Sequence, residues 1–318
     1  MEYKEFLCQI RNCVVELCGN GTKVTLHQVR KNNSMMRDAL LIQKEGENIS
    51  PTIYLDSFYE KHQKGEDVYE IAEKIIEIYE ENDIPKYLNT NDFFEYENVK
   101  DKIIFKLINA DKNKDMLNNV PHRKFYDLAI VYCCFFDRIF GDYATTLINT
   151  EHMEKWSISE NELYELAYEN TLNICKQDFR TMNEIMVDML MSDDISEEIK
   201  DCILEQLQSD EIECPMYVLS NGYKLFGASL IIYEHVMEDI ADKIGNFYII
   251  PSSIHEVILI PEKSDMNVNC MLDMVKEVNA TQVSYDEVLS DNIYLYKSEL
   301  GKITLLNNLN EKAYSFIL

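Results

Sequence analysis

From Met216 to Leu305 the chain repeats one pattern, in which two apolar runs of strand length alternate with one amphipathic helix. Strands are expected at residues 216–220, 227–233, 247–250, 257–260, 292–296 and 302–305, and helices at residues 234–244 and 265–278. Paired strands separated by single helices are typical of an α+β layer. We therefore predict a C-terminal antiparallel or mixed sheet layered with helices, with the helices on one face of that sheet.

The preceding part of the chain is predicted to be richer in helix and to hold only a short sheet. Helices are expected at residues 3–17, 52–63, 68–81, 159–174, 179–191 and 196–208, and strands at 23–30, 38–44, 125–137 and 143–148, while residues 101–108 suit a strand or a short buried helix. The 9 glycines and 6 prolines are too few for a low-complexity architecture. We divide this α+β chain into an N-terminal lobe at 1–120, a C-terminal lobe at 121–306 and a tail at 307–318.

The net charge of the chain limits the classes of molecule that it can bind. The chain holds 30 Lys and Arg against 57 Asp and Glu, a formal net charge of −27. Such a balance argues against direct binding of nucleic acid and against docking on an anionic membrane. Acidic residues concentrate at 60–101 and at 177–213. The second stretch holds 12 acidic residues and only two basic ones, Arg180 and Lys200. These stretches predict a basic protein partner, although acidity that serves solubility alone is the simpler interpretation.

Cysteine usage and the N-terminal residues indicate a compartment. The 9 cysteines fit no metal-binding or redox spacing, and the first residues lack the pattern of a secretory signal. The longest apolar run, residues 128–136, is too short to span a bilayer. We predict a cytoplasmic protein with reduced, mostly buried thiols and no membrane partner.

Every motif in the sequence that begins like a cofactor or metal site is incomplete. The glycines at 19 and 21 follow a helix, whereas a phosphate-binding loop must precede one. Residues 111–115 begin like an EF-hand loop, but Met116 stands where that loop needs glycine. His255 and Glu256 begin like a zincin helix, but Leu259 replaces the second histidine. We therefore predict neither a metal site nor a cofactor.

Ser253 and His255 form the strongest catalytic candidate. On an extended strand the two side chains would point to the same face, so the imidazole could act as a base toward the hydroxyl. Glu256 would point to the opposite face and could not orient that ring. The alternative is a strand start after Pro251, in which the hydroxyls of Ser252 and Ser253 satisfy local backbone groups.

Several polar and aromatic residues are candidates for binding. We predict binding roles for Tyr54, Asn221, Ser252, Glu256, Asn279 and Gln282, and Tyr217 and Tyr248 complete the set for a small-ligand site in the C-terminal sheet. For the stretch from Asn279 to Gln282, a helix C-cap and turn is the competing interpretation.

Five blocks of sequence resemble one family. They are residues 51–59, 216–221, 226–229, 248–256 and 277–283, the fourth reading Tyr-Ile-Ile-Pro-Ser-Ser-Ile-His-Glu. Through these blocks the chain, from its N-terminus to about Tyr296, resembles the domain-of-unknown-function family 5688. The region around residues 147–159, which includes Trp156, is more loosely similar to the domain-of-unknown-function family 1444. The resemblance implies a bacterial cytoplasmic protein and an accessory role near mobile-element genes, and it implies no catalytic residue or cofactor.

Three functions remain open at this point. The first is a non-enzymatic acidic binding or accessory protein whose faces at 66–81 and 188–213 engage a basic partner. The second is a hydrolase that uses Ser253 and His255. The third is a sensor of a small ligand bound in the C-terminal sheet.

Overall fold

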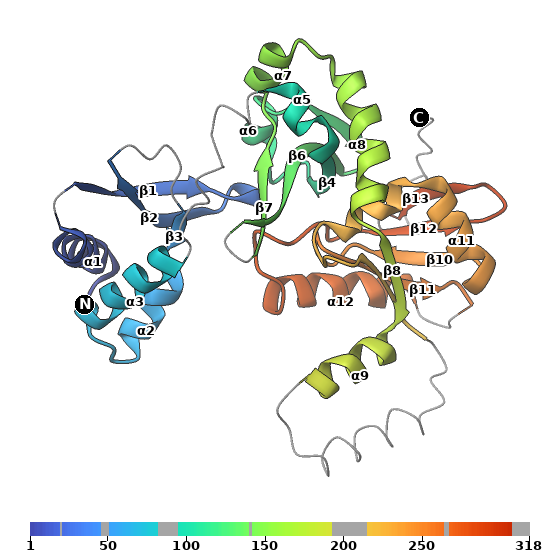
Figure 1. Cartoon of the computed structure of the whole chain (residues 1–318). Helices are drawn as coiled ribbons and strands as arrows, with labels where there is room; N and C mark the ends of the chain where they lie inside the picture. Colours follow the sequence, from blue (N-terminus) through green and yellow to red (C-terminus); the bar gives the residue numbers. More distant parts are fainter. Residues whose placement is uncertain are drawn as a thin grey trace. The chain divides into compact units, whose positions relative to one another are not determined.

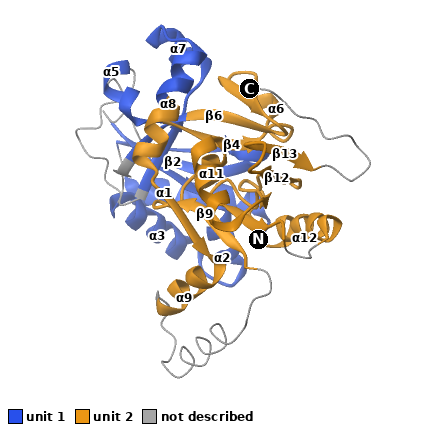
Figure 2. Cartoon of the chain, turned by 90° about the vertical axis from the view of Figure 1, so that its right-hand side faces the viewer, with its two compact units in different colours: residues 1–103, 133–166 blue, residues 104–132, 167–318 orange. Residues whose placement is uncertain are grey.

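The computed structural model describes residues 1–19, 21–45, 51–81, 95–139, 142–192, 215–263 and 267–306. The chain forms two compact units (Figure 2): unit 1 is residues 1–103 with 133–166, and unit 2 is residues 104–132 with 167–318.

The predicted lobe boundary at residue 120 falls inside unit 2. The predicted helix at 196–208 and the predicted tail at 307–318 lie outside the described residues. No helix in the described ranges is both long enough and apolar enough to cross a membrane.

Unit 1 begins with a helix and a three-stranded sheet, of which the helix and the first two strands were predicted. Its elements are α1 (Tyr3–Cys18), β1 (Thr22–Arg30), η1 (Asn32–Ser34), β2 (Met36–Lys44), β3 (Thr52–Tyr54), α2 (Asp56–Gln63), α3 (Val68–Glu81), α5 (Tyr96–Val99), η2 (Lys100–Lys102), β7 (Asp142–Leu147) and α7 (Thr150–Trp156). Strands β1, β2 and β3 pair antiparallel in that order (Figure 1).

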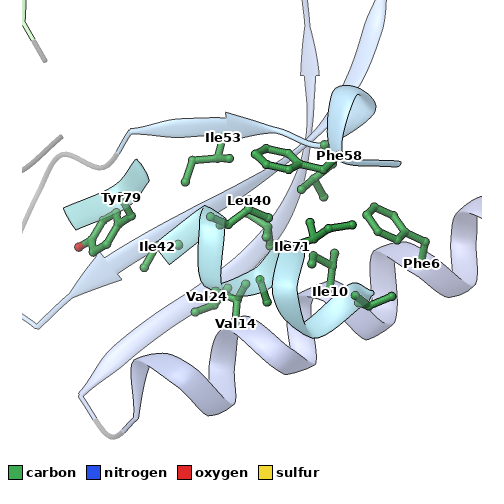
Figure 3. Packing of buried hydrophobic residues seen from close by; sticks show 14 residues of the cluster. Phe6, Ile10, Val14, Val24, Leu40, Ile42, Ile53, Phe58, Ile71 and Tyr79 are labelled. Atoms are coloured by element: carbon green, nitrogen blue, oxygen red, sulfur yellow. The ribbon is translucent and has the colours of Figure 1, made fainter. Parts of the chain in front are cut away.

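The core of this part of unit 1 lies between the sheet and the helices α1 and α3 (Figure 3). The helix α1 buries Phe6, Ile10 and Val14, which recur at intervals of four residues along one face. On α3, buried Ile71 and Ile75 follow the same spacing. The periodicity predicted both helices because residues four apart share one face of a helix.

The predicted helix at 52–63 is wrong in its first part. Thr52 to Tyr54 form strand β3, and helix α2 begins only at Asp56. Thr52 and Ile53 are β-branched and Tyr54 is aromatic, and residues of both kinds favour a strand. Strand β2 provides the partner strand, with Leu40 opposite Ile53. Hydrogen bonding to the edge of β2 therefore stabilises these residues as a strand rather than as a helix.

Unit 2 holds a larger antiparallel sheet. Its elements are α6 (Lys114–Leu117), β5 (His122–Phe125), β8 (Gln177–Thr181), α9 (Met182–Ser192), β9 (Tyr217–Asn221), η3 (Gly227–Ile232), α11 (Glu234–Ile244), β10 (Phe247–Ile250), β11 (Val257–Pro261), α12 (Val268–Thr281), β12 (Ile293–Lys297) and β13 (Lys302–Leu306). Six strands pair in the order β13-β12-β10-β11-β9-β8, and every pair is antiparallel. The fold class is therefore α+β, as predicted.

A four-stranded sheet includes β4 (Ile103–Asn109), β5, β6 (Leu128–Ile139) and β7. Strand β6 pairs with β5 up to Val131 and with β7 from Cys133 onward, which confirms the predicted pairing of residues 125–137 with 143–148. Residues 101–108 thus contribute a strand rather than a buried helix. Helix α8 (Glu160–Ile174), which was predicted at 159–174, begins with a capping box, because Ser159 and Glu162 exchange hydrogen bonds.

The helices of unit 2 cover both faces of the six-stranded sheet, so the prediction of one covered face is wrong. Helix α12 packs on Ile250, Ile260 and Ile293. Alternate residues of a strand point to opposite faces, so Tyr296 points away from α12. Met237 of α11 lines the same pocket as Tyr296, which places α11 on that second face (Figure 1).

The predicted strand at 227–233 is also wrong, since these residues form the 3-10 helix η3. Residues 227–232 are buried on every side, and periodicity cannot distinguish a strand from a helix in such a run. Strand β9 instead pairs with β11 and β8. The predicted helix at 179–191 starts later, at Met182, because Thr181 and Glu184 cap α9 there.

Candidate functional site

Ser253 and His255 lie in a bent loop between β10 and β11 rather than on an extended strand. The Ser253 hydroxyl oxygen accepts the backbone N–H groups of His255 at 3.1 Å and of Glu256 at 3.2 Å. This pattern stabilises the bend locally, as serine hydroxyls often do. The same-face argument for a catalytic pair therefore does not apply to these residues.

The imidazole of His255 is engaged with other groups. Its ring stacks on Phe226 with centroids 5.8 Å apart, and its Nδ1 accepts the Phe226 N–H at 3.4 Å. Its Nε2 lies 3.8 Å from a carboxylate oxygen of Glu287. Burial lowers the pKa of His255, although Glu287 opposes that shift, so the ring is neutral near pH 7. Among the described residues no hydrogen bond joins this ring to the Ser253 hydroxyl, and the geometry gives no support to a serine nucleophile.

Close packing holds this loop against the turn after β9. The Ser220 hydroxyl donates to the carbonyl of His255 at 2.9 Å. A Cβ on Gly227 would lie 2.5 Å from that same carbonyl oxygen, so only glycine fits. Asn221 stabilises the turn itself, because its side chain accepts the N–H of Leu225 and donates to the carbonyl of Leu225. Asn221 is therefore engaged within the protein.

Ser252 and Asn279 both lie near Ser290. Pro251, next to Ser252, accepts the N–H of Ser290, and the Asn279 amide donates to the Ser290 carbonyl at 2.9 Å. The Ser252 hydroxyl and the Asn279 side-chain carbonyl oxygen are buried, and neither has a hydrogen-bond partner in the part of the chain that the structure describes.

The other predicted binding residues are more exposed or lie elsewhere. Gln282 is exposed and forms the C-cap of α12, as its capping interpretation predicts. Glu256 is an exposed residue. Partial burial of its carboxyl group raises the pKa of Glu256, and the positive charge of Lys224 opposes that shift. Tyr54 belongs to unit 1, where the Lys31 ammonium lies 4.1 Å above its ring.

A polar cluster that the sequence did not indicate is centred on Asp127, in the turn between β5 and β6. Its carboxylate accepts the hydroxyls of Ser290 and Tyr294, each at 2.5 Å, and the Asn292 amide at 3.0 Å. Burial and the Asp127 charge raise the pKa of Tyr294 far above its usual value, so this hydroxyl stays protonated. The cluster fastens the β5–β6 turn to the residues that lead into β12.

Beside this cluster a pocket of about 420 Å³ opens in unit 2. Apolar side chains line most of it, namely Phe125, Ile231, Ile232, Met237 and Ile303. Tyr126 also lines it, in a left-handed backbone conformation with φ of 55°, and its hydroxyl donates to the carbonyl of Ile303. The size and lining are those of pockets that bind small molecules in proteins.

Tyr296 contributes to the wall of this pocket, although its hydroxyl is buried away from the open space. The residue is 1% exposed, and its ring stacks on Phe247 at 5.2 Å. Among the described residues its hydroxyl has no hydrogen-bond partner. Burial raises the pKa of Tyr296, and Glu238, Glu234 and Asp242 act in the same direction, so the hydroxyl is protonated. A buried polar group without a partner is unfavourable by about 1–3 kcal/mol, so this hydroxyl lowers the stability of the fold.

Three charged residues also contribute to the pocket lining, namely Lys124, Lys302 and Glu234. Lys302 pairs with Lys297 and precedes Ile303, the partner of Tyr296, so its side chain points to the sheet face opposite Tyr296. Glu238 and Asp242 of α11 also act on Tyr296. The surroundings of the pocket are therefore not basic.

The N-terminus of α11 contributes to the same wall. Glu234 is its first residue, and Tyr233 at the N-cap position makes no side-chain cap. The first backbone hydrogen bond of this helix runs from the Met237 N–H to the Tyr233 carbonyl. The N–H groups before Met237 therefore carry the partial positive charge of a helix start beside the pocket.

Sequence reasoning missed Tyr126, Asp127 and Tyr296. One pattern could have indicated the last of these, because Tyr294 and Tyr296 alternate along a predicted strand. Buried tyrosines usually place their hydroxyls on a partner, so such a pair calls for two partners. Neither partner is visible from the local sequence.

These observations define a class, an α+β protein with a ligand-sized pocket beside its larger sheet. The chain belongs to the family of unknown function DUF5688, whose pattern it matches over residues 3–298. This match confirms the predicted resemblance to that family. No curated protein and no solved structure matches the chain.

Proposed function

We propose that this protein is a non-enzymatic binding protein whose unit 2 pocket takes up a small amphipathic molecule. The observation that carries the proposal is the pocket of about 420 Å³ in unit 2, which apolar side chains line together with the rings of Tyr126 and Tyr296. Moving the apolar part of a ligand from water onto such walls is favourable. Of the three functions considered from the sequence, this one corresponds to the sensor of a small ligand.

The composition of the pocket supports the same proposal. Binding pockets are mostly apolar, hold a few polar groups that orient the ligand, and measure about 300–1,000 Å³. The pocket in unit 2, at about 420 Å³, has this size and this lining. It differs from the Ser253 loop, where the groups nearest the candidate nucleophile are already engaged.

Calorimetric titration with three matched probes tests the proposal. The probes are octanoate, 1-octanol and n-octylamine, which share an apolar body and differ in charge. We expect at least one of them to bind with one-to-one stoichiometry, and Ile232→Trp, which fills the pocket, to abolish that binding. The substitution Met274→Trp on the exposed side of α12 is the control and should leave binding unchanged.

A second pocket variant keeps the test valid if Ile232→Trp does not fold. Met237→Phe narrows the pocket from the α11 side, and thermal unfolding shows whether each variant is folded. If none of the three probes binds the folded wild-type protein, the proposed function is wrong. Binding that survives both pocket variants would also contradict it, because the probe would then lie elsewhere.

The acidic face of α3 favours a second candidate function, the binding of a basic protein partner. Glu70, Glu73, Glu77 and Glu80 are exposed along this helix. Its one lysine, Lys74, pairs with Glu66 at 2.7 Å. The other predicted acidic stretch, residues 188–213, lies mostly outside the described residues. An accessory role near mobile elements in a bacterial cytoplasm is compatible with either function.

Salt dependence tests this second candidate. A partner held by this face should be captured at low salt and lost at moderate salt, because exposed charges are screened within about 10 Å at 0.1 M. The double variant Glu73→Lys with Glu77→Lys should abolish capture at both concentrations. Capture that is insensitive to salt and to these substitutions would contradict it.

A further inference from the structure

We infer that the ligand of the unit 2 pocket is an amphipathic cation, whose apolar body lies in the pocket and whose ammonium group lies beside the acidic residues of α11. This inference rests on the proposed function and adds the chemical class of the ligand. It follows from the apolar and aromatic walls of the pocket together with the carboxylates that border it.

The apolar walls determine the body of the ligand. Ile231, Ile232 and Met237 line the pocket from η3 and α11, and Phe125 and Ile303 line it from β5 and β13. Transfer of an alkyl or aryl body from water onto these side chains is favourable, roughly in proportion to the apolar area that it buries. Sugars and other polyhydroxyl compounds would lose their hydration there without replacement partners.

Three acidic residues lie along one face of α11. Glu234, Glu238 and Asp242 are four residues apart, so successive turns of the helix bring their side chains onto the same face. Glu234 lines the pocket, and the negative charges of all three residues act on Tyr296 in the pocket wall. This acidic face of α11 therefore borders the pocket.

The carboxylates of this face have no balancing cation among the described residues. None of the three forms an ion pair there. Like charges four residues apart on a helix repel one another, and a cation bound beside them relieves that repulsion. Glu234 lies in the first turn of α11, so its charge also opposes the partial positive charge of the helix start.

The two lysines of the lining do not reverse this balance. Lys302 points to the sheet face opposite Tyr296. Lys124 is exposed and precedes the buried Phe125 on β5, so these two side chains point to opposite faces of that strand. Lys124 also takes part in an interaction within the protein. The potential at the pocket is therefore expected to be negative, as on a chain whose net charge is −27.

The aromatic rings of the wall act in the same direction. Phe125, Tyr126 and Tyr296 all line the pocket. The Tyr126 hydroxyl is bonded to the Ile303 carbonyl, and the Tyr296 hydroxyl is buried, so a ligand meets both residues through their rings. The face of an aromatic ring carries partial negative charge, which attracts an ammonium group and repels a carboxylate.

The three matched probes also test the class of ligand. We expect octylamine to bind about tenfold more tightly than octanoate and about two- to fivefold more tightly than 1-octanol, the gain typical of an exposed ion pair. Raised salt should reduce the affinity of octylamine toward that of 1-octanol, because salt screens exposed charges. The affinity of 1-octanol itself should not fall.

Substitutions on α11 test which carboxylate is responsible. Glu234→Gln should weaken octylamine about two- to fivefold and leave 1-octanol unchanged. Asp239→Asn removes the same charge from the same helix outside the pocket lining, and it should leave the affinity of octylamine unchanged. Thermal unfolding shows whether each variant is folded.

The ranking of the probes separates the outcomes. Octanoate bound more tightly than octylamine, or octylamine bound no more tightly than 1-octanol, would overturn the cation and leave the pocket function standing. An affinity for octylamine that Glu234→Gln does not lower would likewise overturn it. Absence of binding by every probe would overturn the cation together with the proposed function.

Discussion

Tyr294 and Tyr296 leave strand β12 on the same face, and among the described residues only Tyr294 has a partner for its hydroxyl. Tyr294 donates to Asp127 at 2.5 Å, whereas the Tyr296 hydroxyl is buried without such a partner. Two identical side chains, two residues apart, therefore have opposite effects on the fold. The first stabilises it, and the second is an unsatisfied buried group that destabilises it.

We expect the two hydroxyls to differ in their effect on stability. Tyr294→Phe should lower the free energy of unfolding by about 1.5–3 kcal/mol, because it removes a hydrogen bond to a charged carboxylate. Tyr296→Phe should leave that free energy unchanged or raise it by up to about 1 kcal/mol, because it removes an unsatisfied group. Urea unfolding of both variants measures the difference, and equal destabilisation by the two substitutions would contradict the arrangement.

Gly227 should tolerate no side chain. Gly227→Ala places a Cβ 2.5 Å from the His255 carbonyl oxygen and 2.7 Å from the Ser220 Cα, and backbone atoms can move little. We expect a loss of about 1–3 kcal/mol in the free energy of unfolding. Gly222→Ala is the matched control, since nothing lies within 4 Å of its Cβ position, and it should change stability by no more than about 0.5 kcal/mol.

The Ser253 hydroxyl should contribute to stability rather than to catalysis. Ser253→Ala removes the acceptor for two backbone N–H groups and should lower the free energy of unfolding by about 0.5–2 kcal/mol, the range found for comparable helix caps. Thermal unfolding measures this loss. Hydrolysis of an activated ester that is present in the wild type and absent in both Ser253→Ala and His255→Gln would revive the hydrolase interpretation.

Stability should fall as pH drops below neutrality. Burial lowers the pKa of both His152 and His255 from the usual 6.5. In this range the unfolded chain binds more protons than the folded protein, so unfolding becomes easier as pH falls below about 6.5. His255→Gln combined with His152→Gln should flatten the profile between pH 7.5 and 5.5. An unchanged slope in the double variant would show that other groups cause it.

The local sequence was sufficient for elements whose pattern repeats over several turns or pairs. Helices α1 and α3 follow from periodicity, since their buried residues recur at intervals of about four along one face. Local pattern failed for the run from Gly227 to Ile232, because residues buried on all sides have no periodic face to read.

The candidate site depended on contacts that no local pattern contains. Its walls come from segments at 124–126, 231–237 and 296–303, which folding alone brings together. The partner that satisfies Tyr294 lies 167 residues earlier in the chain, so nothing near Tyr294 or Tyr296 distinguishes them. Composition and periodicity determined that this chain folds as an acidic α+β protein. Long-range packing decided which of its polar groups are satisfied, because a hydrogen bond depends on distances in space and not on spacing along the chain.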